Sequence, residues 1–365
     1  MMMTEEEGIR SPLHDAQIAA GAEIIWEDGW PWAMTVGEGA ASEYEAIRTA
    51  TGIWDLFSTS KYEVRGADAV HLVQRRFTND LSGLEAGAVR YGAFVNADGT
   101  LIDDGNVYKH ADDKVWVFIN TADMEGWFRE TANGLDATIE HRTADWPMIS
   151  VQGPGSRELL QGLTDAPLED LRYFRFWPEP AKVAGVSATV FRTGFSGELG
   201  FELVTDDPDA VRTLWSALND AGAKPFGLEA VDIARVEAGM IIIALDYMPG
   251  EGSPFDVSLD RFIKAGTDCV GAEALAAIGA APPKRLKTLT LEGDTVPEAG
   301  VAVTSGEQRV GTLTSPVASP RFGTIGLAVL DTDAAIDGAS VQVGDASATV
   351  APLSVYDPTK QKPRS

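Results

Sequence analysis

The segment from Tyr91 to Tyr108 constrains the fold most, because two short β-type runs flank a sequence that is typical of a tight turn. The turn sequence is Asn96-Ala97-Asp98-Gly99, in which Asp and Gly tolerate the left-handed backbone conformations that a tight reversal needs. We therefore predict a β-hairpin over this segment.

The second arm of the hairpin carries two adjacent acids, Asp103 and Asp104, with apolar residues on both sides. Neighbours on a strand point to opposite faces, so one carboxylate should face solvent and the other should face the apolar side. A carboxylate on the apolar face is costly in free energy unless another group pairs with it. A bulge or turn that leaves both acids in water is the alternative, and the spacing alone favours it.

This hairpin resembles the folate-site hairpin of the aminomethyltransferase family, which includes the glycine cleavage T-protein and related tetrahydrofolate-dependent demethylases. The resemblance implies that tetrahydrofolate is the cofactor. It also implies that Asp104 lies against the reactive nitrogens of the folate as the catalytic residue, and that Tyr91 and Tyr108 line the same site.

Residues 193–202, with the sequence TGFSGELGFE, form a second informative motif. The glycines lack the spacing of a dinucleotide-binding loop and suit a tight connection between two strands. Strand alternation places Glu202 on the face opposite Phe201. The motif is similar to the family's Thr-Gly-Tyr-Thr-Gly-Glu-x-Gly-Phe-Glu, whose last Glu hydrogen-bonds the pterin. The resemblance implies that the carboxylate of Glu202 anchors the pterin by accepting hydrogen bonds from two adjacent N–H groups of the ring. It also implies that Phe195 stands where the family usually has a tyrosine.

A helix is predicted over residues 227–238, where Arg235 and Glu237 are the informative members. From the residues alone, these two side chains would form a surface ion pair that contributes little to stability. The family has Gly-Leu-x-Ala-x-Asp-x-x-Arg-x-Glu-Ala here, and the resemblance implies that Arg235 reaches into the folate cavity.

Two tryptophans, Trp30 and Trp32, flank a proline near the start of the chain. The residues themselves favour a clamp that closes over the edge of a core. In the family this region lies near the mouth of the folate and substrate cavity. If the methyl donor is a quaternary ammonium or sulfonium compound, the two rings would supply cation–π contacts of about 1–2 kcal/mol.

The strand that begins at Gly52 is expected to continue through residues 61–66. Between these parts the T-protein has Ser-His-Met-Gly, whereas this chain has Phe57-Ser58-Thr59-Ser60. The missing His and Met lie beside the folate and the donor in T-proteins. The difference favours a relative that acts on another methyl or one-carbon donor, with Ser58 and Ser60 as candidate substrate residues.

Composition excludes several classes of protein. The chain has 365 residues and a net charge of −26, which argues against nucleic acid or an anionic membrane as a partner. No apolar run approaches the ~20 residues that cross a bilayer, and the start of the chain is acidic rather than signal-like, so a cytoplasmic location is expected. The single cysteine, Cys269, excludes an internal disulfide, and the four histidines lack metal-ligand spacing, so no metal is expected.

The acidic residues recur along the whole chain instead of forming one tail. Such a distribution is typical of the highly solvated surface of salt-adapted proteins, so a halophilic source is a hypothesis.

The fold class that we predict is α+β, namely a three-lobed T-protein-like folate-binding fold with a C-terminal β-barrel. Residues 1–275 would form two α+β lobes, one of them discontinuous, residues 276–284 a linker, and residues 285–356 the barrel. Further helices are expected at 43–50, 67–77, 122–133 and from Asp207 onward. Barrel strands are expected at 286–291, 301–304, 310–315, 324–330 and 341–343.

The resemblance implies a tetrahydrofolate-dependent methyltransferase that demethylates a small methylated substrate. The alternative is the glycine cleavage aminomethyltransferase itself, in which case a lipoyl carrier protein is also a partner. A folate-binding iron–sulfur assembly factor of the same fold is less favoured, because Cys269 lacks the Lys-Gly-Cys context of that group. Whether the donor carries its methyl group on nitrogen, sulfur or oxygen stays open, as does the oligomeric state.

Overall fold

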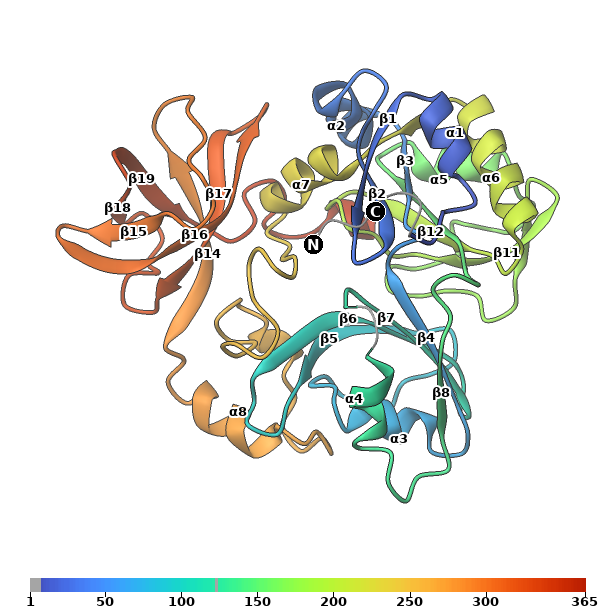
Figure 1. Cartoon of the computed structure of the whole chain (residues 1–365), viewed down its shortest axis with the longest axis horizontal. Helices are drawn as coiled ribbons and strands as arrows, with labels where there is room; N and C mark the ends of the chain where they lie inside the picture. The colour runs from blue at the N-terminus through green and yellow to red at the C-terminus, as the bar shows by residue number, and fades with distance from the viewer. Residues whose placement is uncertain (1–7, 122–123) are drawn as a thin grey trace.

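The computed structural model describes residues 8–121 and 124–365, and it consists of three lobes around a common centre (Figure 1). The first lobe is a five-stranded sheet in the order β5-β6-β7-β4-β8. Its strands are β4 (Ser60–Arg65), β5 (Val89–Val95), β6 (Leu101–Ala111), β7 (Lys114–Ile119) and β8 (Thr138–His141), with helices α3 (Ala69–Gln74) and α4 (Glu125–Arg129) beside them.

The predicted hairpin is formed by β5 and β6, which pair antiparallel from Val89 opposite Tyr108 to Val95 opposite Leu101. Gly99 in the turn has a φ of +81°, in the left-handed region that its sequence predicts. The two neighbouring helices are shorter than expected. Of the helix expected over 122–133, residues 122–123 lie outside the described part of the chain.

The second lobe is a six-stranded sheet in the order β10-β11-β12-β9-β3-β13. Its strands are β3 (Gly52–Asp55), β9 (Met148–Gln152), β10 (Ala181–Val183), β11 (Val186–Phe191), β12 (Gly200–Val204) and β13 (Lys224–Pro225). Around it lie the hairpin of β1 (Ala22–Glu27) and β2 (Trp30–Val36) and the helices α1 (His14–Ala19), α2 (Ala40–Thr49), α5 (Ser156–Gln161), α6 (Pro208–Asp220) and α7 (Leu228–Glu237). Helix α6 begins as predicted, because Asp207 accepts a hydrogen bond of 2.8 Å from the amide of Asp209.

The prediction of one continuous strand from Gly52 to Gly66 is wrong. Strand β3 belongs to the second lobe and β4 to the first, with residues 56–59 crossing between the two sheets. The Nζ of Lys61 donates hydrogen bonds to the carbonyls of Leu56, Phe57 and Thr59, at 3.1, 2.9 and 2.8 Å. These carbonyls lie in the segment between the two sheets, where no sheet partner faces them, and the lysine supplies a donor to each.

The third lobe is a closed barrel in the order β14-β17-β16-β15-β18-β19. Its strands are β14 (Lys284–Leu291), β15 (Ala302–Ser305), β16 (Gln308–Ser319), β17 (Gly323–Asp331), β18 (Ser340–Val343) and β19 (Ala346–Ala351). The first five match the expected strands, and β19, which was not predicted, closes the barrel against β14. Short 3₁₀ turns lie at Asp260–Phe262 (η1) and Lys362–Arg364 (η2), and helix α8 (Ala272–Gly279) covers the start of the range expected to be a linker.

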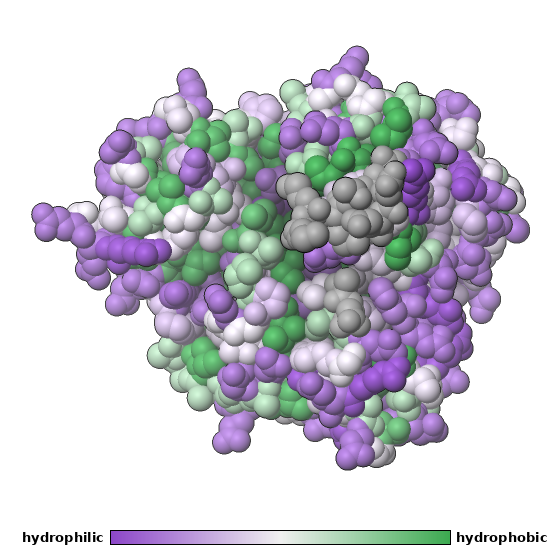
Figure 2. All heavy atoms as spheres, viewed as in Figure 1, coloured by the Kyte–Doolittle hydropathy of each residue, from purple (hydrophilic) through white to green (hydrophobic). Residues whose placement is uncertain are grey.

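The visible face of the molecule is largely hydrophilic, with smaller groups of hydrophobic residues among the charged ones (Figure 2). Within the described residues, no helix is both long enough and apolar enough to cross a membrane.

Candidate functional site

A cavity of about 460 Å³ lies where the first two lobes meet the segment that follows α7. Strands β2, β3, β6, β7 and β12 all contribute side chains to its wall. Its lining residues include Glu27, Asp28, Trp30, Trp32, Trp54, Ser58, Ser60, Tyr91, Asp104, Asn106, Tyr108, Asn120, Thr121, Phe195 and Glu202. The cavity therefore gathers every sequence-predicted site residue except Arg235.

Both members of the acid pair are buried, so the expectation that one faces solvent is wrong, as is the alternative that both do. Asp103 accepts hydrogen bonds from the backbone amides of Asp104 at 2.7 Å and Thr121 at 2.8 Å, and from the side chain of Asn120 at 2.9 Å. The two residues that follow β7 thus bind the carboxylate that a lone hairpin would expose. Burial raises the pKa of Asp103, and these hydrogen bonds oppose the shift.

Asp104 is held by a tyrosine hydroxyl on each carboxylate oxygen. Tyr91 donates to Oδ2 at 2.7 Å, and Tyr247 donates to Oδ1 at 2.6 Å. Burial raises the pKa of Asp104 to about 7, the charge of Asp103 adds to the shift, and the tyrosine hydrogen bonds oppose it. A carboxyl group that titrates near neutrality in a cavity can hold or accept a proton during a reaction.

Glu202 lies on β12 with its carboxyl group at the cavity, while its neighbour Phe201 packs into the core of the second lobe, as strand alternation predicts. The hydroxyl of Thr193 donates a short hydrogen bond to Oε2. Burial raises the pKa of Glu202 to about 7, against the hydrogen bond from Thr193 and the charge of Lys61. Lys61 is itself fully buried, and burial lowers its pKa to about 7.

Two buried polar atoms on cavity residues, Nε1 of Trp54 and Oδ1 of Asn106, have no hydrogen-bond partner among the described residues. Buried polar groups are almost always satisfied, so these atoms indicate a ligand that offers both donors and acceptors. A reduced pterin, whose ring edge carries adjacent N–H and C=O groups, fits this set together with Glu202.

The N-terminal aromatic residues have two roles in the structure. Trp30 is buried and packs against Phe57, with ring centroids 5.5 Å apart, which agrees with a clamp over a core edge. Trp32 is only partly buried and lies 6.1 Å from Trp54. The hydroxyl of Ser58 donates a hydrogen bond to the carbonyl of Pro31 at 2.6 Å. This bond joins β2 to residues 56–59, which cross between the two sheets.

Arg235 and Glu237 do not form a surface ion pair, because both are fully buried and each binds other residues. Arg235 donates to Asp246 at 2.5 Å and to the hydroxyl of Ser315 in the barrel at 2.7 Å. Asp246 in turn contributes to the raised pKa of Asp104. Arg235 therefore supports the wall from behind, and its direct contact with folate stays a prediction.

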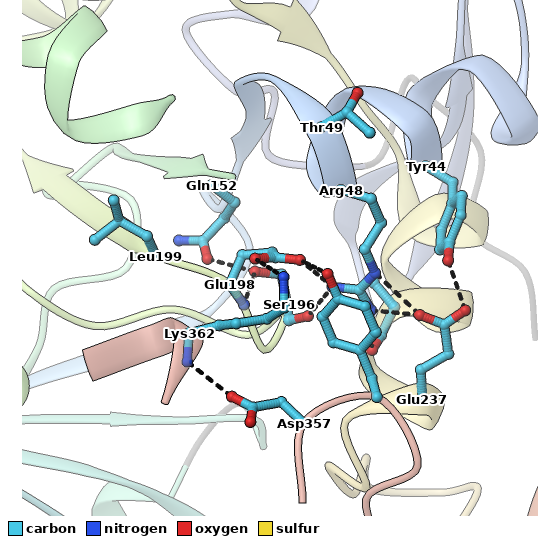
Figure 3. A network of polar contacts seen from close by, with 12 residues as sticks. Tyr44, Arg48, Thr49, Gln152, Ser196, Glu198, Leu199, Glu237, Asp357 and Lys362 are labelled. Atoms are coloured by element: carbon cyan, nitrogen blue, oxygen red, sulfur yellow. Dashed lines mark hydrogen bonds and ion pairs between the residues drawn. The ribbon is translucent and has the colours of Figure 1, made fainter. Parts of the chain in front are cut away.

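Glu237 belongs to a buried polar network that joins α2, α7, the loop before β12 and the segment after the barrel (Figure 3). Arg48 contacts Glu237 at 2.6 Å and Glu198 at 3.2 Å, and its guanidinium lies 3.9 Å from the ring centre of Tyr356. Tyr44 donates to Glu237 at 2.7 Å. The network fixes the loop that carries Phe195 relative to the two helices.

Sequence reasoning missed Tyr247, Asn120, Trp54 and Lys61. Tyr247 lies in an irregular segment whose residues have no periodicity, so no local signal identified it. Lys61 carried no signal either, because polar and apolar residues alternate over residues 60–65 and place Lys61 on the same face as Glu63 and Arg65. Within the described residues, no group of three His, Cys, Asp or Glu side chains is arranged to hold a metal ion.

Comparison with known families agrees with this geometry. Residues 13–267 match the GCVT N-terminal domain, and residues 284–357 match the glycine cleavage T-protein C-terminal barrel domain. The chain belongs to the glycine cleavage T-protein (GCVT) family. It is thus a member of the aminomethyltransferase family of folate-dependent transferases.

Relatives match this GCVT family member over nearly their whole length. A probable aminomethyltransferase of Halobacterium salinarum is 35% identical over 350 residues, which cover 92% of this chain and 94% of the relative. An aminomethyltransferase of Thermotoga petrophila is 33% identical over 344 residues, which cover 92% and 91%. These names agree with the aminomethyltransferase alternative better than with the demethylase interpretation.

The predicted fold class is confirmed by a solved structure. The crystal structure of glycine cleavage system aminomethyltransferase T from Bartonella henselae has a TM-score of 0.87 and 22% sequence identity to this GCVT family member, covering 95% of this chain and 98% of that one. Both chains therefore share the three-lobed fold.

Proposed function

We propose that this protein transfers a one-carbon group to tetrahydrofolate. The observation that carries the proposal is Asp104, a buried carboxyl group inside the cavity whose pKa is raised to about 7 and whose two oxygens are fixed by Tyr91 and Tyr247. Bound tetrahydrofolate would supply a nucleophilic ring nitrogen, and the carboxyl group would orient that nitrogen and take up its proton. Orientation of this kind accounts for much of the rate of a displacement reaction.

Glu202 on β12 would anchor the pterin in the cavity that Asp104 on β6 also lines. A carboxylate accepts two parallel N–H donors, and the Thr193 hydroxyl fixes its plane. Tyr91, Tyr108 and Phe195 supply aromatic surface for the rest of the ring, and the unpartnered Oδ1 of Asn106 offers a further hydrogen bond.

The names of the relatives support an aminomethyl donor that a lipoyl carrier protein presents. The product would then be 5,10-methylene-tetrahydrofolate. Under this proposal the carrier is a second partner, and it would insert the arm that bears the donor into the cavity.

A second candidate is demethylation of a small methylated substrate, which would produce 5-methyl-tetrahydrofolate. The residues at 57–60 favour it, because this part of the cavity wall carries serine and threonine where the T-protein has His and Met. The hydroxyl of Ser58 donates its hydrogen bond to the carbonyl of Pro31, so Ser58 maintains the shape of the cavity wall.

The test is to incubate the purified protein with tetrahydrofolate and a donor panel, and to measure methyl- and methylene-tetrahydrofolate by mass spectrometry. The panel contains methylated amines, sulfonium compounds, aryl methyl ethers, and glycine with its lipoylated carrier. Methylene product from the carrier selects the first candidate, and methyl product from a small donor selects the second. If the protein has no affinity for any reduced folate in a direct titration, the proposal fails.

A further inference from the structure

The loop between β11 and β12, residues 192–199, carries two groups that shape the cavity. Phe195 lines the cavity, and the hydroxyl of Thr193 donates to the carboxyl group of Glu202. The loop has no regular secondary structure, so contacts outside it must fix its course. A shift of this loop would therefore move an aromatic part of the wall and change the orientation of Glu202 together.

On one side the loop is seated on Gln152 of β9. The hydroxyl of Ser196 donates to Oε1 of Gln152 at 2.7 Å, and both residues are buried. A Cβ at Gly194 would lie 2.3 Å from the same oxygen, so the loop approaches this amide as closely as only glycine allows. The loop therefore cannot move further toward β9.

On its other side the loop is held by Arg48 and Tyr356 (Figure 3). Arg48 donates to the carbonyl of Ser196 at 2.8 Å and contacts Oε1 of Glu198 at 3.2 Å. Tyr356 donates a shorter hydrogen bond to the same oxygen of Glu198, and its ring centre lies 3.9 Å from the guanidinium carbon of Arg48. Lys362 lies farther away, at 3.8 Å from the other oxygen. Because Glu198 is buried, its carboxyl group depends on these donors.

Tyr356 comes from the segment that follows the barrel, and no described residue after Pro249 lines the cavity. The backbone amides of Val355 and Tyr356 both donate to the carbonyl of Glu237, at the end of α7, at 3.0 Å. These two bonds anchor the tyrosine to a helix of the second lobe. The segment after the barrel therefore contacts the loop without contributing to the cavity wall.

We propose that Tyr356 is a positioning residue for folate binding, which acts through Glu198 on the β11–β12 loop. The loop then keeps Phe195 on the cavity wall and Thr193 on Glu202. The inference rests on the proposed transfer to tetrahydrofolate. It assigns part of the folate affinity to a residue that lies outside the folate cavity.

The variant Tyr356→Phe tests the inference, because it removes the hydroxyl and keeps the ring on Arg48. Hydrogen–deuterium exchange of the full chain without folate should be about five- to ten-fold faster over residues 192–199, since a hydrogen bond to a buried carboxylate stabilises the loop. Calorimetric titration with tetrahydrofolate should give a Kd about three- to ten-fold higher than that of the unmodified protein. Unchanged exchange or an unchanged Kd overturns the inference.

Steady-state kinetics separates positioning from chemistry. With a donor that the panel selects, KM for tetrahydrofolate should rise in Tyr356→Phe while kcat stays within about two-fold. The reason is that Asp104 is held by Tyr91 and Tyr247 instead of by this loop. A fall in kcat with an unchanged KM overturns the inference.

A double-mutant cycle tests the route through Glu198. Glu198→Ala should weaken folate binding at least as much as Tyr356→Phe does. Adding Tyr356→Phe to Glu198→Ala should change the Kd by less than about two-fold, because the hydroxyl then has no carboxylate to bind. Effects that multiply would show that Tyr356 does not act through Glu198, and they would overturn the inference.

Val350→Ala is the matched control for a general loss of stability. It shortens a side chain in the buried cluster of the barrel and leaves the contacts of Glu198 intact. Denaturant unfolding should show that this variant is destabilised, while its Kd for tetrahydrofolate stays within about two-fold of the unmodified protein. Equal weakening of folate binding in Val350→Ala and Tyr356→Phe would assign the effect to stability and overturn the inference.

The unmodified protein distinguishes the two proposals. If it binds tetrahydrofolate and Tyr356→Phe binds equally well, only the positioning role is removed. If it binds no reduced folate, the proposed function fails, and the exchange measurement alone decides whether Tyr356 holds the loop.

Discussion

Tyr247 donates a hydrogen bond of 2.6 Å to Oδ1 of Asp104, although 143 residues separate the two in the chain. Tyr91, which faces Asn106 across the hairpin, donates to the other oxygen at 2.7 Å. The carboxyl group is therefore fixed in plane by one local and one distant hydroxyl. Its position depends on the hairpin and on the segment after α7 together, so the site exists only when these parts are assembled.

Replacing Asp104 by asparagine should lower turnover by about a hundred-fold or more, because the amide can neither carry the charge nor take up a proton. The fold should persist, since the amide has nearly the same shape and the protein already favours an uncharged group at this position. Steady-state kinetics and circular dichroism measure the two effects, with Asp112→Asn as the control. Unchanged turnover would remove Asp104 from the mechanism.

The same variant should change the dependence of stability on pH. The pKa of Asp104 is about 7 in the folded protein and near 3.8 in the unfolded chain, so between these values the folded state holds a proton that the unfolded state has released. The free energy of unfolding of the unmodified protein therefore loses this contribution as pH rises from about 4 to about 7. The free energy of unfolding of the Asp104→Asn variant should fall less over the same pH range. Urea unfolding of both proteins at pH 5 and pH 7.5 checks the sign, and parallel curves would contradict it.

Glu202→Gln should weaken the binding of reduced folate by roughly ten-fold or more, because a hydrogen bond to a charged group contributes about 1.5–3 kcal/mol. A direct titration separates this loss of affinity from an effect on the chemical step. The matched control is Glu169→Gln, which removes an exposed carboxylate in the loop after α5. Equal affinity in both variants would show that Glu202 does not hold the pterin.

Glu237→Gln should lower the free energy of unfolding by about 3 kcal/mol, because it leaves the fully buried guanidinium of Arg48 with only Glu198 as a charged partner. Adding Arg48→Met to this variant should cost less than the sum of the single changes. Denaturant unfolding measures all three proteins. Glu125→Gln, which removes a surface pair with Arg129 on α4, should cost no more than about 0.5 kcal/mol and serves as the control.

High salt should stabilise this protein strongly. A net charge of −26 produces repulsion within the folded chain, and molar potassium chloride screens it. We expect the thermal midpoint to rise steadily between dilute buffer and molar salt. A midpoint that is high in dilute buffer and independent of salt would end the hypothesis of a halophilic source.

Local patterns predicted the elements whose residues carry their own signals. The turn at Asn96–Gly99, the Asp207 cap of α6 and the alternation that separates Glu202 from Phe201 depend only on neighbours in sequence. The prediction of one strand from Gly52 to Gly66 was wrong, because nothing in these residues shows that its two halves belong to different sheets. The prediction that one acid of the pair faces solvent was wrong for a similar reason, since Asn120 and Thr121, which bind Asp103, belong to the segment after the next strand.

By itself, the sequence determined the hairpin, the order of most strands and helices, and the residue types that the cavity needs. The tertiary structure alone decided that Tyr247 meets Asp104, that Arg235 faces the barrel, and that Asp104 and Glu202 line one cavity. The reason is physical. Secondary structure follows from periodicity and backbone conformation over a few residues, whereas a pKa or a binding site depends on which groups the folded chain brings within a few ångströms of one another.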